Sequence, residues 1–179
     1  MNKTFASMGI NASLVEALTN QHITEPTAVQ EQAVPAALKG HNLLVQAQTG
    51  TGKTLAFLLP IFQGIKKDVS MTQALIMAPT RELSEQLATV ADSFTPVTGL
   101  DILNLIGGKT IENKLQKLHR RPQVIIGTPG RLLDHCRRNS LDLSGVHYVV
   151  VDEADQMLQS GFLSEVDELI GLTPKKRQL

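Results

Sequence analysis

Two short stretches of the sequence carry residues that could bind and cleave a phosphoryl group. The first, AQTGTGKT (47–54), follows an apolar run and precedes a helical pattern. Gly50 and Gly52 allow positive φ, so successive N–H groups can point into one concavity, and the next helix adds its N-terminal donors and dipole. The Lys53 ammonium can reach β- and γ-phosphates, and the Thr54 hydroxyl can ligate Mg²⁺. This phosphate-binding loop also includes Gln48, Thr49 and Thr51.

The second stretch is YVVVDEAD (148–155), in which a run of valines ends in a cluster of acids. A valine run is typical of a strand buried on both faces, and an unpaired carboxylate there is costly. In parallel α/β sheets, ligands lie beyond the carboxyl ends of the strands. We therefore expect Asp152 to hold Mg²⁺, directly or through water, and Glu153 to orient and deprotonate a water. The alternative is an acidic start of the next helix, which explains one acid but not three.

The elements that must position these residues follow an alternating pattern. Short apolar runs, expected to be buried strands, lie at 42–46, 74–78, 100–106, 123–127 and 147–151. Between them lie helical patterns at 53–65, 81–94, 110–120 and 130–138. This alternation predicts an α/β fold, a mostly parallel sheet with helices on both faces. Two more helices precede the first strand, and capping-box patterns open them at 13–16 and 27–30.

Composition limits the classes of protein and partner. The chain has 179 residues, of which 42% are hydrophobic and 19% charged, as in an ordinary globular domain. Its formal net charge is zero, so any nucleic-acid site must be local. Cys136 is the only cysteine, which excludes an internal disulfide and favours a reducing compartment, the cytoplasm. The longest apolar run, 55–62, is too short to span a bilayer, so no membrane partner is expected.

The letters DEAD at 152–155, together with the phosphate loop, resemble the DEAD-box family of ATP-dependent RNA helicases over essentially the whole chain. Proteins of this family carry two RecA-like domains. The resemblance implies that residues 1–179 form the first, an α/β P-loop NTPase domain that stops just before the family's Ser-Ala-Thr motif. It implies ATP and Mg²⁺ as cofactors, and RNA and the second RecA-like domain as partners.

Residues near the N-terminus resemble the family's adenine-binding elements. Phe5 is similar to its isolated upstream aromatic, and EPTAVQ (25–30) to its Q motif, in which Gln30 would pair with adenine N6 and N7. Thr27 belongs to the same motif, but Thr27 and Gln30 also satisfy the spacing of a capping box. The chain departs from the motif at His22 and Ile23, where the family has glycine and an aromatic. Isoleucine can cover an adenine but cannot stack on it.

Three further stretches resemble the family's RNA-contacting motifs, namely PTREL (79–83), the pair at 107–108 and TPGR (128–131). The residues expected at RNA are Pro79, Thr80, Arg81, Gly107, Gly108, Thr128, Pro129, Gly130 and Arg131. Thr80 and Thr128 could be plain helix N-caps, but a helix N-terminus at the ligand edge is itself a phosphate site. Contacts of this kind predict little sequence preference, because phosphates carry no base information.

The resemblance implies an enzyme that couples ATP hydrolysis to local RNA unwinding. Asp155 would couple the acidic loop to neighbouring motifs. This chain alone would be nearly inactive, because the catalytic arginine belongs to the second domain. Two alternatives stay open: another P-loop enzyme, such as a small-molecule kinase, and a non-catalytic, ATP-dependent RNA clamp. Cys136 lies on a predicted helix without a His or Asp partner, which favours a core thiol over a nucleophile.

Overall fold

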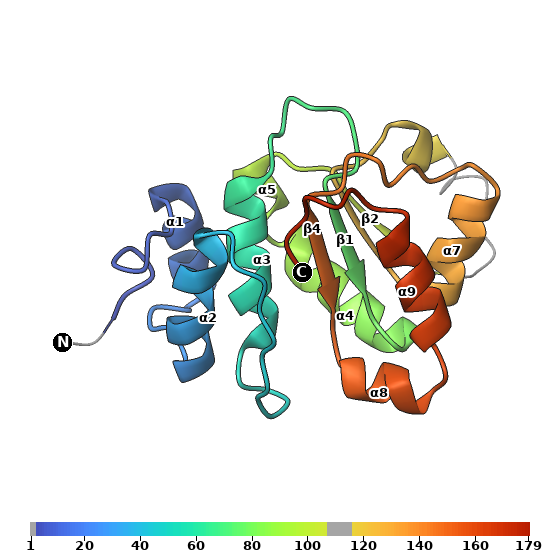
Figure 1. Ribbon diagram of the computed structural model, residues 1–179. Helices are drawn as coiled ribbons and strands as arrows, with labels where there is room; N and C mark the ends of the chain where they lie inside the picture. The colour runs from blue at the N-terminus through green and yellow to red at the C-terminus, as the bar shows by residue number, and fades with distance from the viewer. Residues whose placement is uncertain (1–2, 107–115) are drawn as a thin grey trace.

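The sheet at the centre of the molecule has four parallel strands (Figure 1). The computed structural model describes residues 3–106 and 116–179. Across the sheet, the strands lie in the order β2 (Ile102–Leu105), β3 (Val124–Gly127), β1 (Ala74–Met77) and β4 (Tyr148–Val151). Leu75 is paired with Ile125 on one side and with Val149 on the other. Four of the five predicted strands are thus confirmed, and their carboxyl ends share one edge.

Helices flank the sheet, and most begin where the sequence predicts. They are α1 (Ala12–Asn20), α2 (Ala28–Leu38), α3 (Lys53–Gly64), α4 (Arg81–Asp92), α5 (Thr95–Thr98), α7 (Pro129–Arg137), α8 (Ala154–Gln159) and α9 (Leu163–Gly171). The prediction over 110–120 falls largely outside the described residues. The predicted cap at Ser13 is wrong, because Asn11 caps α1 by accepting from the Leu14 N–H. No helix within 3–106 or 116–179 is long and apolar enough to cross a membrane.

Alternate residues of each strand build two cores, one on each face of the sheet. Ile76 and Ile126 face a core shared with α1, α3 and α4. Leu75, Ile125 and Val149 face a second core, which α7, α8 and α9 complete. Because both faces are covered, β1, β3 and β4 are apolar throughout rather than alternating, whereas β2, at the edge of the sheet, contains Asn104. The predicted arrangement of helices on both faces is therefore confirmed.

The predicted first strand, residues 42–46, is not a strand in this structure. Its Leu43 N–H donates to the Leu179 carbonyl at 2.9 Å, and the Leu44 side chain is 98% exposed. A parallel strand needs a hydrogen-bonded neighbour along its length. Among the described residues, the place beside β4 holds only Gln178, which forms an isolated parallel bridge with Tyr148, and then Leu179. Residues 42–52, here called the loop arm, therefore run to α3 outside the sheet (Figure 1).

Candidate functional site

The phosphate loop makes the tight turn that its glycines predict. Gly50 and Gly52 have φ of +82° and +90°, the left-handed region that favours glycine. Gly52 is also the N-cap of α3, so the loop passes directly into the first turn of that helix. A Cβ at Gly52 would lie 2.5 Å from Gln30 Nε2, so the position lacks room for any side chain. The Thr51 hydroxyl closes the turn by donating to the Gln48 carbonyl at 2.7 Å.

Lys53 and Asp152 lie near enough at the carboxyl edge of the sheet for their charges to interact. Lys53 is the first residue of α3, and its Nζ donates to the Ala47 carbonyl. Asp152 follows β4, and its N–H extends the ladder by donating to the Met77 carbonyl at 2.9 Å. Burial raises the pKa of Asp152 above its ordinary value and the Glu153 charge adds to this, whereas the nearby Lys53 charge lowers it. The glycine loop and the acidic strand end therefore lie near one another, and the shared metal–phosphate site stays a prediction.

Glu153 has a left-handed backbone conformation that its residue type does not predict. Its φ and ψ are +49° and +52°, and it is the N-cap of α8. The left-handed conformation costs a non-glycine residue roughly 1–2 kcal/mol. Backbone strain of this kind clusters at functional sites, which agrees with the predicted catalytic role without testing it. Neither glycine nor asparagine, the usual signals for this conformation, occupies the position.

Asp155 is exposed in the first turn of α8. That position favours an acid through the helix dipole, which was the simpler interpretation of the acidic cluster. The Asp155 side chain has no hydrogen bond or ion pair with any residue of 3–106 or 116–179. Its coupling to neighbouring motifs therefore stays a prediction.

Gln30 connects the Q-motif stretch to the phosphate loop. Its side chain is only 2% exposed; Oε1 accepts from the Thr27 N–H at 3.0 Å, and Nε2 donates to the Gly52 carbonyl at 3.0 Å. The capping role is therefore present, and the bond to Gly52 is one that spacing alone did not predict. Each carboxamide atom retains one further lone pair or hydrogen, so adenine pairing by Gln30 stays a prediction.

Phe5 and Ile23 lie in the apolar core around α1. The Phe5 ring is 2% exposed, and Ile23 packs against the same core. A ring this buried presents no free face to a base. The predicted adenine contact of Phe5 remains untested, and it would require the ring to leave the core.

The predicted RNA motifs lie at the starts of helices that follow β1 and β3. Thr80 is the N-cap of α4, and its hydroxyl accepts from the Leu83 N–H at 3.1 Å. Thr128 occupies the same place before α7, with Pro129 in the first turn and no cap bond from the hydroxyl. The N-cap alternative thus holds for Thr80, and both starts share the edge where Asp152 lies. The pair at 107–108 falls outside the described residues.

Arg131 is held within the first turn of α7, while Arg81 at the start of α4 is exposed. An Arg131 Nη1 hydrogen bond reaches Asp134 Oδ2 at 3.1 Å, and Asp134 also binds Arg138. The Arg131 Nε–H is buried and, within the described part of the chain, has no hydrogen-bond partner. The guanidinium therefore keeps an unused donor beside the predicted phosphate-binding helix start.

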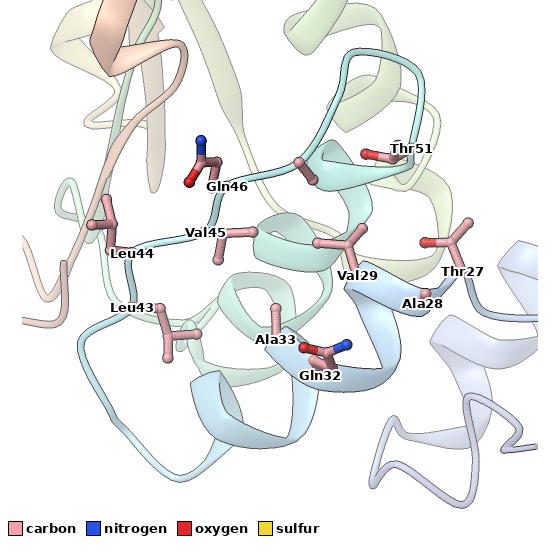
Figure 2. A pocket seen from close by; sticks show the side chains of 11 residues that line it. Thr27, Ala28, Val29, Gln32, Ala33, Leu43, Leu44, Val45, Gln46 and Thr51 are labelled. Atoms are coloured by element: carbon pink, nitrogen blue, oxygen red, sulfur yellow. The ribbon is translucent and has the colours of Figure 1, made fainter.

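A cavity of about 660 Å³ lies between α2 and the loop arm (Figure 2). Its walls are mostly apolar side chains, among them Val29, Leu43 and Val45, with Thr27 and Thr51 at one end. Gln30, Lys53 and Asp152 do not line it. The cavity thus adjoins the phosphate loop, through Ala47 and Thr51, rather than Asp152.

Sequence and structure comparisons identify relatives of this chain. The family model described as DEAD/DEAH box helicase matches residues 27–179. The chain belongs to this family. It is 40% identical over 176 residues to "ATP-dependent RNA helicase DeaD" of Escherichia coli strain K12, covering 98% of this chain and 28% of the relative. It is 41% identical over 178 residues to "RNA helicase CrhR" of a Synechocystis strain, a match that covers 99% of this chain and 36% of the relative.

Solved structures of DEAD-box proteins share the fold. A DEAD box protein of Methanococcus jannaschii superposes with a TM-score of 0.91 at 32% identity, over 99% of this chain and 49% of that chain. A Saccharomyces cerevisiae Dbp5 variant bound to Gle1 and IP6 also gives a TM-score of 0.91, at 32% identity. The match covers 100% of this chain and 46% of that chain. This DEAD-box chain is therefore a RecA-like domain that spans about a third of the length of its curated relatives.

Cys136 of this DEAD-box domain has the character of a core thiol. It lies on α7, half-buried against the core that α9 completes. Burial raises its pKa to about 11, and the charges of Asp142 and Glu168 contribute to the rise. A thiol with this pKa is protonated at neutral pH and a poor nucleophile, which agrees with the interpretation from the sequence.

Proposed function

We propose that this chain is the ATP-binding half of an RNA-unwinding enzyme, which acts in the cytoplasm together with a second RecA-like domain. The observation that carries the proposal is the convergence of Lys53, from the glycine loop, and Asp152, from the end of β4. A cation and a carboxylate at a phosphate loop are the parts that hold a nucleotide triphosphate with its metal. The curated relatives, named as RNA helicases, support the choice of substrate.

Mg²⁺ suits the donors that this site offers. The Thr54 hydroxyl and the Asp152 carboxylate are hard oxygen donors, and Mg²⁺ commonly takes one or two such protein ligands together with phosphates and waters. Within 3–106 and 116–179, no three His, Cys, Asp or Glu side chains gather into a metal site. A metal that arrives with the nucleotide needs no such cluster. When bound, it supplies positive charge to the β- and γ-phosphates.

Different protein groups bind the nucleotide and position the attacking water. The amides around Gly50 and Gly52 and the Lys53 ammonium hold the phosphates, and Gln30 selects adenine. Asp152 must be ionised to act as a ligand. Glu153 orients a water toward the γ-phosphate and accepts its proton.

RNA binding is proposed for the same edge of the sheet. The N-termini of α4 and α7 offer backbone donors to phosphates, and Arg81 and Arg131 add positive charge. Because these groups contact phosphates rather than bases, binding tolerates many sequences. The second RecA-like domain contributes the catalytic arginine, so we expect this chain alone to bind ATP but hydrolyse it very slowly.

The test is strand separation of a short RNA duplex by the protein that contains this chain and the second domain. The Glu153→Gln variant should keep ATP·Mg²⁺ binding but lose at least about 100-fold in ATP turnover and stall unwinding. Glu16→Gln, an exposed acid on α1, is the matched control and should behave as the unaltered protein. Full unwinding by Glu153→Gln would contradict the proposal that ATP hydrolysis is coupled to strand separation.

RNA affinity separates the proposal from a small-molecule kinase. The Arg131→Ala variant should weaken binding of single-stranded RNA several-fold, because one phosphate contact is lost. Arg137→Ala removes a charge from the other end of α7, where it pairs with Glu168, and should have little effect. Equal RNA affinity in both variants would contradict the proposed RNA edge.

A further inference from the structure

The spacing between Lys53 and Asp152 needs a structural cause other than strand pairing. Asp152 is fixed by the ladder between β4 and β1. The loop arm, which leads to Lys53, has no ladder bonds to β4. The position of Lys53 therefore depends on how α3 packs, and contacts between α3 and β4 bear directly on its distance from Asp152.

One such contact joins the end of α3 to the start of β4. Gly64 is the last residue of α3 and Tyr148 the first of β4. A Cβ on Gly64 would lie 1.9 Å from the Tyr148 hydroxyl oxygen and 2.8 Å from Cζ. The φ of Gly64 is not positive, so glycine is required there for space rather than for backbone conformation. The Tyr148 hydroxyl has no hydrogen bond within the described residues, so packing alone places the ring against the helix.

The contact lies at the opposite end of α3 from the phosphate loop. α3 and β4 run in opposite directions, so Gly64 and Tyr148 lie at one end and Lys53 and Asp152 at the other (Figure 1). A helix of 12 residues is about 18 Å long, and closely packed interiors transmit displacement. A change in the distance between Gly64 and Tyr148 should therefore tilt α3 and move Lys53.

We propose that Gly64 and Tyr148 are positioning residues that set the separation of Lys53 from Asp152. The inference rests on the proposed function, because it concerns the same ATP·Mg²⁺ site. A positioning role predicts a specific loss of affinity. The gain in ATP affinity that Mg²⁺ provides requires Lys53 and Asp152 together. ATP affinity without Mg²⁺ needs only the loop and Lys53.

The experiment compares ATP affinity of this chain in excess Mg²⁺ and in EDTA, using displacement of a fluorescent ATP analogue. In Gly64→Ala, the ratio of the two affinities should fall about tenfold, since small misplacement of site groups has large effects. Affinity in EDTA should change little. Circular dichroism and thermal melting establish that each variant is folded at the assay temperature.

Gly171→Ala is the matched control. Gly171 is the last residue of α9, as Gly64 is of α3, and a Cβ there meets no atom within 4 Å. Its affinity ratio should equal that of the unaltered chain.

Distinct results overturn the inference and the proposed function. If the unaltered chain binds ATP·Mg²⁺ and folded Gly64→Ala keeps the same ratio, the positioning role is wrong. An equal loss of affinity with and without Mg²⁺ would also overturn it, by showing a general packing defect. If Gly64→Ala does not fold, Tyr148→Val alone must show the lowered ratio. An unaltered chain that fails to bind ATP at all overturns the proposed function itself.

Discussion

The two halves of the candidate site are built in different ways. Asp152 extends a strand that is paired with β1 from Tyr148 to Val151 and lies between two cores. The phosphate loop instead follows an arm outside the sheet, and side-chain contacts such as that of Gln30 with Gly52 hold it. Both halves begin with an apolar run, yet only one becomes a strand. An apolar run forms a strand only where a neighbour pairs with it along its length.

The largest difference is expected between a substitution in the paired sheet and one in the loop arm. Ile76→Ala in β1 should lower the free energy of unfolding by about 2–5 kcal/mol, because Ile76 is fully buried and the change leaves a cavity. Leu44→Ala in the arm should change it by less than about 0.5 kcal/mol, since Leu44 is 98% exposed. Urea unfolding measures both. Comparable losses would show that the arm is packed as a strand.

A smaller effect should follow from removing the side-chain link that holds the loop. Gln30→Glu keeps an oxygen for the Thr27 N–H but loses the donor to the Gly52 carbonyl. We expect a loss of about 1–3 kcal/mol in the free energy of unfolding, because the partly buried Gly52 carbonyl loses the Gln30 donor and keeps only the Ala56 N–H, while a carboxylate is buried at position 30.

Gln32→Glu on the exposed face of the same helix is the control for added charge. It should be close to neutral by the same urea titration. Equal effects at positions 30 and 32 would mean that the Gln30–Gly52 bond contributes nothing.

The smallest effect concerns the half of the site that contains Asp152, and it depends on pH. Folding raises the pKa of Asp152, mainly through burial, so ionised Asp152 destabilises the folded chain at neutral pH. Asp152→Asn should therefore be more stable to urea than the unaltered chain at pH 7. The difference should shrink as pH falls through the raised pKa and vanish below the ordinary value of 3.8. A destabilised Asp152→Asn at pH 7 would contradict this sign.

The sequence predicts local features well because their causes are local. The apolar runs give β1 to β4, and the spacing of glycines gives the positive φ of Gly50 and Gly52. Which residue caps α1 depends on the competition between Asn11 and Ser13, and two polar residues in one turn do not decide it.

Features that depend on distant partners could not be predicted. Residues 42–46 have the pattern of a strand but lack a partner along their length. The contact of Gly64 with Tyr148 joins residues far apart in the chain, and the left-handed backbone of Glu153 has no signal in its residue type. For this reason the sequence predicts the members of the site but not what holds the two halves together.

Paramagnetic broadening by Mn²⁺·ATP tests the convergence of the two halves most directly. Mn²⁺ replaces Mg²⁺ at oxygen sites and broadens the NMR signals of nearby amides. The account predicts that amide signals of 50–54 and of 151–153 broaden together on addition of Mn²⁺·ATP, and that Lys53→Ala reduces both. Broadening confined to one of the two segments would contradict a shared metal–triphosphate site.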